Sequence, residues 1–476
     1  MDGGSASCEC DEGFEADEDA CVDIDECAEE QPCDENAACE NTEGNYECTC
    51  EAGFFGNGHR CVPRTRLVSV SLTNQPSSFY NAGPSLSADG RFVAFYGPGD
   101  DLAPGDTNNT LDVFVFDGET GKVSRVSVNS AGAEANGWSA YPNISGDGRY
   151  VVFTSYANNL VANDINDMVD VFRHDRTTGE TIRVNLSNSG AEGIAPQDYG
   201  SFPTVSADGN LVAFTSGASN LVSGDTNALP DQFVRDIGAS KTVRVNLKSD
   251  GGQVGGTAYT LNSCPSISSD GRYVVFASPS SDLGGAADSY VDIYRRDLED
   301  EVIRLVTYAR PGDAIDDHSG NPSTSTTGRY VVFQSSATTL VSGDTNGEPD
   351  IFVRDMETGS IELVSVNNAG EQANRGSYLS FQRSISGDGR YVVFASSATN
   401  LVAGDTNNSI DIFVRDREER TTTRVSLGAM GQQATTTSGD ATISEDGKVV
   451  AFITLSEGLG GPVTGSVDQV WIRYLD

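Results

Sequence analysis

The feature that most constrains the fold of this chain is a repeat that begins at Arg66 and continues to the C-terminus. The period is about 60 residues, which is typical of a solenoid, an array or a propeller. Each unit contains a P-x-I-S-x-D-G stretch, an apolar run such as RYVVF, a segment such as DIFVRD and an outer segment such as RVSV. The β-branched and aromatic content of these segments favours strands over helix. Each unit therefore predicts a four-stranded sheet.

The apolar run occurs seven times, which predicts seven blades and an all-β fold. The runs end at Phe95, Phe153, Phe214, Phe276, Phe333, Phe394 and Phe452. Asp-Gly precedes six of these runs and supplies the positive backbone angles of a tight hairpin. The fifth repeat has Thr327-Gly328 in that place.

The order of the segments predicts how a ring of blades would close. The repeat region starts with a single outer-type strand, RLVSVS from Arg66, and ends after DQVWIRYLD, so the last blade lacks its fourth strand. We expect the strand at Arg66 to fill that gap, because a closed ring has no free strand edges to invite aggregation.

These repeats resemble the TolB-like propeller repeat family, which is similar to Trp-Asp-repeat propellers, over residues 66–476. The resemblance rests on the I-S-x-D-G-R-Y-V-V-F stretch followed by an I-F-V-x-D strand. It implies the propeller fold but no particular activity, because one fold serves many functions.

A second region is defined by its cysteines, since nine of the ten precede Val62 in an acidic segment with few aliphatic residues. Such crowding predicts disulfides in place of a hydrophobic core, and an oxidising compartment. Six of these cysteines, with the surrounding DIDEC and CENTEGNYECTCEAGFFGNGHRC, resemble the calcium-binding EGF-like family. Spacing alone permits fifteen connectivities, whereas the resemblance implies the pairs Cys27–Cys39, Cys33–Cys48 and Cys50–Cys61.

The same resemblance implies a calcium site at the entrance of this unit. It assigns side-chain ligands to Asp23, Glu26 and Asn41, and backbone carbonyl ligands to Ile24, Thr42 and Asn45. Oxygen ligands of this kind suit Ca²⁺. The alternative is that Asp23 and Glu26 only solvate a linker.

Cys8, Cys10 and Cys21 look like the last three cysteines of a preceding EGF-like unit, so we expect the chain to be truncated at its N-terminus. Cys10 and Cys21 can still pair, whereas Cys8 and Cys264 are left unassigned. We expect Cys264 to be a buried free thiol. The predicted domains are a partial EGF-like unit at 1–22, an EGF-like domain at 23–62, a linker at 63–65 and the propeller at 66–476.

The charge of the chain limits its partners. With 70 acidic and 30 basic residues, the formal net charge is −40, which disfavours binding to nucleic acids and to anionic membrane surfaces. Such a surface suits divalent cations or a salty medium, or serves solubility alone. No apolar run reaches the roughly 18 residues that a membrane span needs, so we expect no direct membrane insertion. Disulfides indicate an extracellular or cell-surface location, although the given N-terminus has no signal peptide.

Long loops are expected on one face of the propeller, where each second strand leads to the third and where one blade crosses to the next. Binding residues concentrate on such loops. Five of them carry D-x-N-x-x-x-D, a spacing that can converge on a cation or can form a side-chain-to-backbone turn without metal. The proposed metal ligands are Asp106, Asn108, Asp112; Asp164, Asn166, Asp170; Asp225, Asn227, Asp231; Asp344, Asn346, Asp350; and Asp405, Asn407, Asp411. Asp292 and Asp468 are assigned to the same strand-leading position in the other two blades, in a structural role.

Residues that break the repeat symmetry are the candidates for catalysis, and the sequence offers few. Of the three histidines, His318 lies beside Asp316 and Asp317 in a crossover, where a solvated loop is the simpler interpretation. No nucleophile elbow, zinc-binding helix or phosphate loop occurs. Trp138 could be an aromatic platform for a sugar or peptide, or a packed loop anchor. These observations predict that the chain is not an enzyme.

The sequence thus predicts a calcium-binding, extracellular or cell-surface interaction module for adhesion or scaffolding, with an unidentified protein or glycan partner on the long-loop face. The first alternative is a propeller hydrolase or lyase with a calcium ion in the central channel as a Lewis acid. The second is a spacer within a longer surface protein. The three hypotheses differ in the ions that they require. The interaction module needs several equivalent peripheral ions, and the enzyme needs one axial ion. The spacer needs no ligand beyond calcium.

Overall fold

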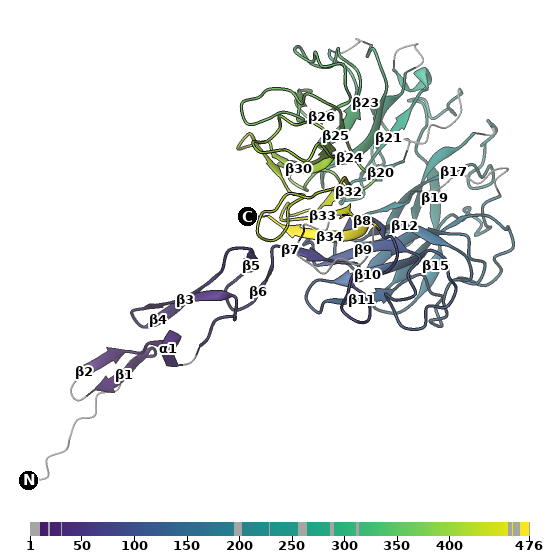
Figure 1. Ribbon diagram of the computed structural model, residues 1–476. Helices are drawn as coiled ribbons and strands as arrows, with labels where there is room; N and C mark the ends of the chain where they lie inside the picture. The colour runs from purple at the N-terminus through teal and green to yellow at the C-terminus, as the bar shows by residue number, and fades with distance from the viewer. Residues whose placement is uncertain are drawn as a thin grey trace, which may run out of the picture.

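The computed structural model describes residues 10–17, 20–29, 31–194, 202–227, 229–255, 264–285, 290–310, 314–455, 459 and 467–475. Within these ranges, seven antiparallel sheets of four strands form a β-propeller, and three two-stranded sheets form an N-terminal module. The module stands off from the propeller as a narrow extension (Figure 1). The predicted all-β architecture with seven blades is confirmed.

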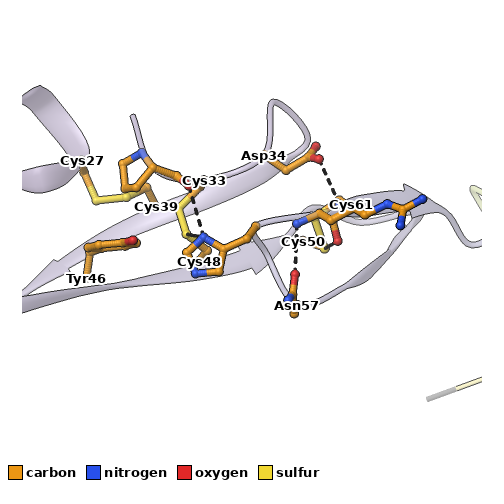
Figure 2. The surroundings of a disulfide bond; sticks show 12 residues. Cys27, Cys33, Asp34, Cys39, Tyr46, Cys48, Cys50, Asn57 and Cys61 are labelled. Atoms are coloured by element: carbon orange, nitrogen blue, oxygen red, sulfur yellow. Dashed lines mark hydrogen bonds between the residues drawn. A yellow bond between two sulfur atoms is a disulfide. The ribbon is translucent and has the colours of Figure 1, made fainter. Parts of the chain in front are cut away.

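Cross-links hold the N-terminal module together, because its strands bury little surface. It contains β1 (Phe14–Asp17), β2 (Ala20–Asp23), the short helix α1 (Glu26–Glu29), β3 (Ala37–Thr42), β4 (Asn45–Cys50), β5 (Phe54–Gly56) and β6 (Cys61–Pro63). The three implied pairs, Cys27–Cys39, Cys33–Cys48 and Cys50–Cys61, are confirmed, as is Cys10–Cys21. Figure 2 shows how Asp34 supports them, because its carboxylate accepts the backbone N–H of Cys61 at 3.1 Å. Cys8 lies outside the described residues.

The first four blades follow one another along the chain, each an antiparallel meander. Blade 1 contains β8 (Ala82–Leu86), β9 (Phe92–Gly97), β10 (Asp112–Asp117) and β11 (Lys122–Arg125). Blade 2 contains β12 (Ser139–Ile144), β13 (Tyr150–Ser155), β14 (Asp170–Asp175) and β15 (Thr181–Arg183). Blade 3 contains β16 (Thr204–Val205), β17 (Leu211–Ser216), β18 (Asp231–Asp236) and β19 (Lys241–Arg244). Blade 4 contains β20 (Ser266–Ile267), β21 (Tyr273–Ser278), β22 (Asp292–Asp297) and β23 (Ile303–Leu305), with the 3₁₀ turn η1 (Ser281–Leu283) between its second and third strands.

The last three blades complete the ring. Blade 5 contains β24 (Ser319–Thr324), β25 (Tyr330–Ser335), β26 (Asp350–Asp355) and β27 (Ile361–Leu363). Blade 6 contains β28 (Ser377–Tyr378), β29 (Tyr391–Ser396), β30 (Asp411–Asp416) and β31 (Thr421–Arg424). Blade 7 contains β32 (Ser438–Ile443), β33 (Val449–Thr454), β34 (Gln469–Tyr474) and, from the start of the repeat region, β7 (Thr65–Leu67).

The hydrophobic core is divided among the interfaces between neighbouring blades. Seven buried clusters each combine side chains of two adjacent blades, as where Phe95 of β9 lies in one cluster with Ala451 of β33. The phenylalanine that ends each repeated apolar run is at most 1% exposed. The runs are therefore buried central strands, as their composition predicted.

The ring closes as predicted, because β7 pairs with β34 in the register Trp471–Leu67, Ile472–Arg66 and Arg473–Thr65. Ser69 adds a side-chain lock, since its hydroxyl donates to Gln469 Oε1 at 2.6 Å and accepts the N–H of Val470 at 3.1 Å. Every other blade has an equivalent lock on its strand-leading aspartate, such as Thr307 on Asp292 at 2.6 Å.

This register corrects one assignment from the sequence. Trp471 pairs with Phe452 as Phe172 pairs with Phe153, and Asp170 leads its strand two residues before Phe172. The residue two before Trp471 is Gln469. Gln469, and not Asp468, therefore holds the strand-leading position in blade 7; the motif D-Q placed the aspartate one residue too early.

The N-terminal module contacts the propeller at the closure. The ring of Phe55 stacks on that of Tyr474 with centroids 4.9 Å apart. Nearby, Arg60 Nη2 donates to the carbonyl of Glu119 at 2.5 Å and Arg66 Nη1 to that of Gly118 at 2.7 Å. A cavity of about 340 Å³ lies at this junction, between β5–β6 and the hairpin turns of blade 1. The module is thus held by side chains as well as by its covalent link.

Two glycines with a positive φ, one in a hairpin turn and one in a long loop, allow a test of how closely the blades pack. Gly389 has a φ of +80°, and a Cβ added there would meet the ring of Tyr330 of the preceding blade at 2.1 Å. Gly404 has a φ of +76° and nothing within 4 Å of such a Cβ. We expect Gly404→Ala to lose about 1 kcal/mol of stability from backbone strain alone, and Gly389→Ala a further ~1–3 kcal/mol from overpacking. Thermal unfolding of both variants checks this; equal losses would show that the blade contact contributes nothing.

Candidate functional site

The entrance of the EGF-like unit brings several of the predicted calcium ligands together at one end of a hairpin. Asp23 ends β2, and its carboxylate accepts the amide of Asn41, at the end of β3, at 2.8 Å. Thr42 and Asn45 face each other across the hairpin, where the Thr42 hydroxyl donates to the carbonyl of Asn45 at 2.8 Å. Ile24 is held by its N–H, which donates to the carbonyl of Gly13 at 3.0 Å.

Glu26 has a buried carboxylate oxygen that lacks a hydrogen-bond donor among the described residues. It is the first residue of α1 and is 8% exposed, and its Oε2 atom is buried with no hydrogen-bond partner among the described residues. An unpaired buried carboxylate oxygen is unfavourable unless a cation or donor compensates it. The donor set of carboxylates, an amide and backbone carbonyls therefore fits a hard cation such as Ca²⁺.

The five D-x-N-x-x-x-D loops have one shared geometry. In each loop the asparagine side-chain oxygen accepts the backbone N–H two residues later, at 2.9–3.1 Å. In each loop its Nδ2 also donates to a backbone carbonyl of the following crossover, at 2.9–3.2 Å. The asparagine carboxamide is thus engaged in the side-chain-to-backbone turn that the sequence allowed as one interpretation.

In four of the five loops an arginine from the fourth strand lies between the two aspartates. Its nitrogens lie 2.9–4.0 Å from the oxygens of the two carboxylates in every case. The four sets are Arg125 with Asp106 and Asp112, Arg183 with Asp164 and Asp170, Arg244 with Asp225 and Asp231, and Arg424 with Asp405 and Asp411. The guanidinium is therefore an internal cation for each pair. The prediction of calcium in these loops stays a prediction.

Burial controls the ionisation of these carboxylates. It raises the pKa of Asp106 to about 6, reinforced by the nearby charge of Asp112 and opposed by Arg125. It likewise raises the pKa of Asp170 to about 6, against the opposing effect of Arg183. Burial also raises the pKa of Asp225 and of Asp405. In each of these loops the arginine lowers the pKa of the aspartate against the effect of burial, and so favours the charged carboxylate.

The loop of blade 5 is the exception. Leu363 pairs with Phe352 at the position where Arg125 pairs with Phe114, so no arginine enters this loop. Asp344 and Asp350 instead share the Gln372 amide, which donates to them at 2.7 and 2.8 Å. Burial raises the pKa of Asp350. This pair of carboxylates thus has a neutral bridging group in place of a cation.

The residues singled out as symmetry-breaking in the sequence serve local packing. His318 Nδ1 accepts the backbone N–H of Val291 at 3.0 Å, and its ring lies edge-on to that of Tyr290. Asp316 accepts the hydroxyl of Thr338 at 2.6 Å. Trp138 is half-buried. Cys264 is buried and belongs to none of the four disulfides, and burial raises the pKa of its thiol.

The sequence analysis missed where the symmetry is broken most, which is at the propeller axis. In each blade the innermost strand pairs with the second strand at an equivalent residue, such as Asn143 opposite Val152 in blade 2. The residue two positions before it differs from blade to blade: Gly83, Tyr141, Phe202, Cys264, Asn321, Gln382 and Asp440. In blade 6 the bonded serines Ser377 and Ser396 are 19 residues apart, whereas Ser139 and Ser155 of blade 2 are 16 apart. This insertion was visible as extra residues before Q-R-S-I-S.

The insertion in blade 6 fills the axis with side chains that bond non-adjacent blades. The Gln382 amide donates to the carbonyl of Pro142 in blade 2 at 3.1 Å, and its oxygen accepts from Asn143 at 3.1 Å. Arg383 Nη2 donates to Ser269 in blade 4 at 3.1 Å, and Nη1 lies 3.3 Å from Glu445 in blade 7. The axis is thus specific in its chemistry, unlike the repeated periphery.

Two standard kinds of feature are absent from the described residues. No group of three or more His, Cys, Asp or Glu side chains there is arranged to hold a metal ion. No helix in that part of the chain is both long and apolar enough to cross a bilayer.

Comparison with known proteins matches one family to part of the N-terminal module and finds solved structures of low similarity to the chain. Residues 27–61 match the EGF domain family. No curated protein sequence matches the chain. A TolB-like protein from Agrobacterium tumefaciens is 16% identical, over 77% of this chain and 98% of that chain, with a TM-score of 0.39. An oligogalacturonate lyase from Vibrio parahaemolyticus is 13% identical, over 87% and 96%, with a TM-score of 0.48. A prolyl endopeptidase is 11% identical, over 83% and 50%, with a TM-score of 0.46.

These comparisons correct the prediction that the chain is not an enzyme. The structures that resemble it include enzymes, among them the lyase and the endopeptidase. The absence of standard catalytic motifs from a sequence does not exclude an enzyme, because function depends on the site and not on the fold. Similarity at this level transfers no activity to the chain.

The arginine loops make a prediction about stability and its pH dependence. Arg244→Met leaves Asp225 and Asp231 buried without their cation, and we expect a loss of about 3 kcal/mol at pH 8. Burial already raises the pKa of Asp225, so the folded state binds this proton more tightly than the unfolded state does. The loss should therefore shrink as the pH falls from 8 to 5. Urea unfolding at both values measures it, with Arg304→Met, an exposed arginine, as the control. A loss independent of pH would contradict the neutralising role.

Proposed function

We propose that this protein is an extracellular or cell-surface interaction module whose EGF domain binds calcium. The buried Oε2 atom of Glu26, which has no hydrogen-bond partner among the described residues, carries the proposal, together with the Asp23–Asn41 pair. Asp23, Glu26 and Asn41 would hold the ion with side-chain oxygens, and Ile24, Thr42 and Asn45 with backbone carbonyls. Disulfide-bonded EGF domains are typical of extracellular proteins, which supports the location.

Calcium at this entrance has a mechanical consequence. The site joins the β1–β2 hairpin, through Asp23, to the β3–β4 hairpin, through Asn41. The other end of the module contacts the propeller through Phe55 and Tyr474. A bound ion would thus stiffen the extension that positions the long-loop face of the propeller relative to whatever precedes residue 10. The partner on that face is a protein or glycan.

In the propeller, we propose that blade 5 is the loop that accepts a calcium ion. Asp344 and Asp350 have only the neutral Gln372 between them, whereas the other four loops hold an arginine. Asn346 would complete the set of oxygen ligands after rotation of its amide, which now donates to Asp350 at 2.9 Å.

Calorimetric titration of the full chain tests both calcium sites. We expect Glu26→Gln to weaken calcium binding at the EGF site at least tenfold, because it removes one carboxylate charge from the ligand set. Leu363→Arg should abolish the blade 5 site by supplying the guanidinium that the other loops have, without changing the first. Leu305→Arg, in a blade without the D-x-N loop, is the control. Two sites that survive both substitutions would overturn the assignment.

A propeller enzyme with one metal ion on the axis is the second candidate function. The observation that favours it is the set of unlike residues around the axis, since catalysis needs groups that sibling blades do not supply. Electron paramagnetic resonance with Mn²⁺ distinguishes the two. One tight ion retained in the Glu26→Gln/Leu363→Arg double variant favours an axial site, and loss of all tight ions in that variant contradicts it.

A further inference from the structure

The long-loop end of the propeller axis holds a cluster of aromatic rings from three consecutive blades and from one blade across the axis. Tyr96 lies 5.4 Å from Tyr141, Tyr141 lies 4.4 Å from Phe202, and Phe202 lies 4.9 Å from Phe381, measured between ring centroids. These residues belong to blades 1, 2, 3 and 6. Phe381 is 40% exposed and the nearby Tyr80 is 44% exposed, so solvent reaches the cluster.

A carboxylate without a cation lies beside these rings. Asp440 lies in β32, which packs against β8, the strand of Gly83. The ring of Tyr96 lies 2.6 Å from where a Cβ on Gly83 would be, and the Gly83 N–H donates to the carboxylate of Asp440. Burial and the charge of a second acid, Asp468, raise the pKa of Asp440, and within the described residues no ion pair includes either one.

The backbone at this ring of residues is held in an unfavourable conformation. Tyr141, Asn321 and Asp440 occupy the same position in three blades with φ values of +55°, +48° and +44°. Non-glycine residues rarely adopt this region, and for a bulky tyrosine it is disfavoured by about 1–2 kcal/mol. Strain of this kind persists where the surrounding structure holds a side chain in place, which is common at ligand sites.

We propose that the aromatic cluster at the axis, with Asp440, binds a small molecule that carries a quaternary ammonium group. The faces of aromatic rings attract such a cation. Burial raises the pKa of Asp440, and a bound cation would favour the ionised form of its carboxylate. Charge complementarity selects this class over a neutral sugar or an apolar ligand, because the cluster lies beside two acids without a counter-ion. The inference goes beyond the proposed interaction role, because it adds a small-molecule site to the face that we assign to a protein or glycan partner.

Titration of the full chain with choline, followed by calorimetry and tyrosine fluorescence, tests this site. The matched neutral probe is 3,3-dimethylbutan-1-ol, which has the same shape without the charge. We expect saturable binding of choline and at least tenfold weaker binding of the neutral probe. Asp440→Asn should weaken choline binding at least tenfold, and it should fold, because asparagine tolerates a positive φ. Phe381→Leu, at an exposed position, should weaken it severalfold.

Two control variants and one parallel measurement make the outcomes decisive. Asp167→Asn changes an exposed aspartate with a φ of +52°, and Tyr156→Ala removes an aromatic ring that is 48% exposed and outside the cluster; neither should change choline binding. Calcium binding is titrated in the same samples, so that failure of the EGF site and of the axial site are distinguished. Equal affinity for the neutral probe, absence of saturable choline binding, or unchanged choline binding in Asp440→Asn and Phe381→Leu would each overturn the proposal.

Discussion

The pairing of β7 with β34 is the interaction on which the rest of the structure depends. A propeller whose last blade lacked its fourth strand would leave an open sheet edge and one unsupported interface between blades. Here Arg66 and Leu67 complete the sheet, and Ser69 repeats the side-chain lock that the other blades form within themselves. Because only Arg64 separates β6 from β7, the same closure fixes where the EGF domain leaves the propeller.

The repeat also determines which residues are structural and which are free to vary. The strand-leading aspartate, its lock and the hairpin glycine recur around the ring, since every blade must solve the same packing problem. The chain carries a formal charge of −40, and burial of two aspartates per loop is possible in four blades because an arginine lies between them. Blade 5 and the axis depart from the pattern. The two sites proposed in the propeller lie in the blade 5 loop and at the axis. There, a bound cation or ligand would take the place of the contacts that the other blades form.

Much of the fold could be predicted from the sequence, because the period, the Asp-Gly turns and the apolar runs all describe one repeated sheet. The disulfides followed from the resemblance of the cysteine segment to EGF domains. Side-chain contacts between blades were harder to predict from the sequence. The arginines of the loops lie 13 and 19 residues after the two aspartates. Only an alignment of the repeats would have shown Leu363 in place of Arg244 or Arg424. The extra residues of blade 6 were visible, but their reach across the axis depends on tertiary structure, as does the cluster around Tyr141.

We infer that arginine neutralises four propeller loops, and we propose that calcium binds at the EGF entrance. Anomalous diffraction at long wavelength, from crystals of the full chain grown in calcium, distinguishes these two kinds of site. We expect a peak within coordination distance of Asp23, Glu26 and Asn41, and none beside Arg125, Arg183, Arg244 or Arg424. Peaks beside those arginines, or no peak at the EGF entrance, would contradict these assignments.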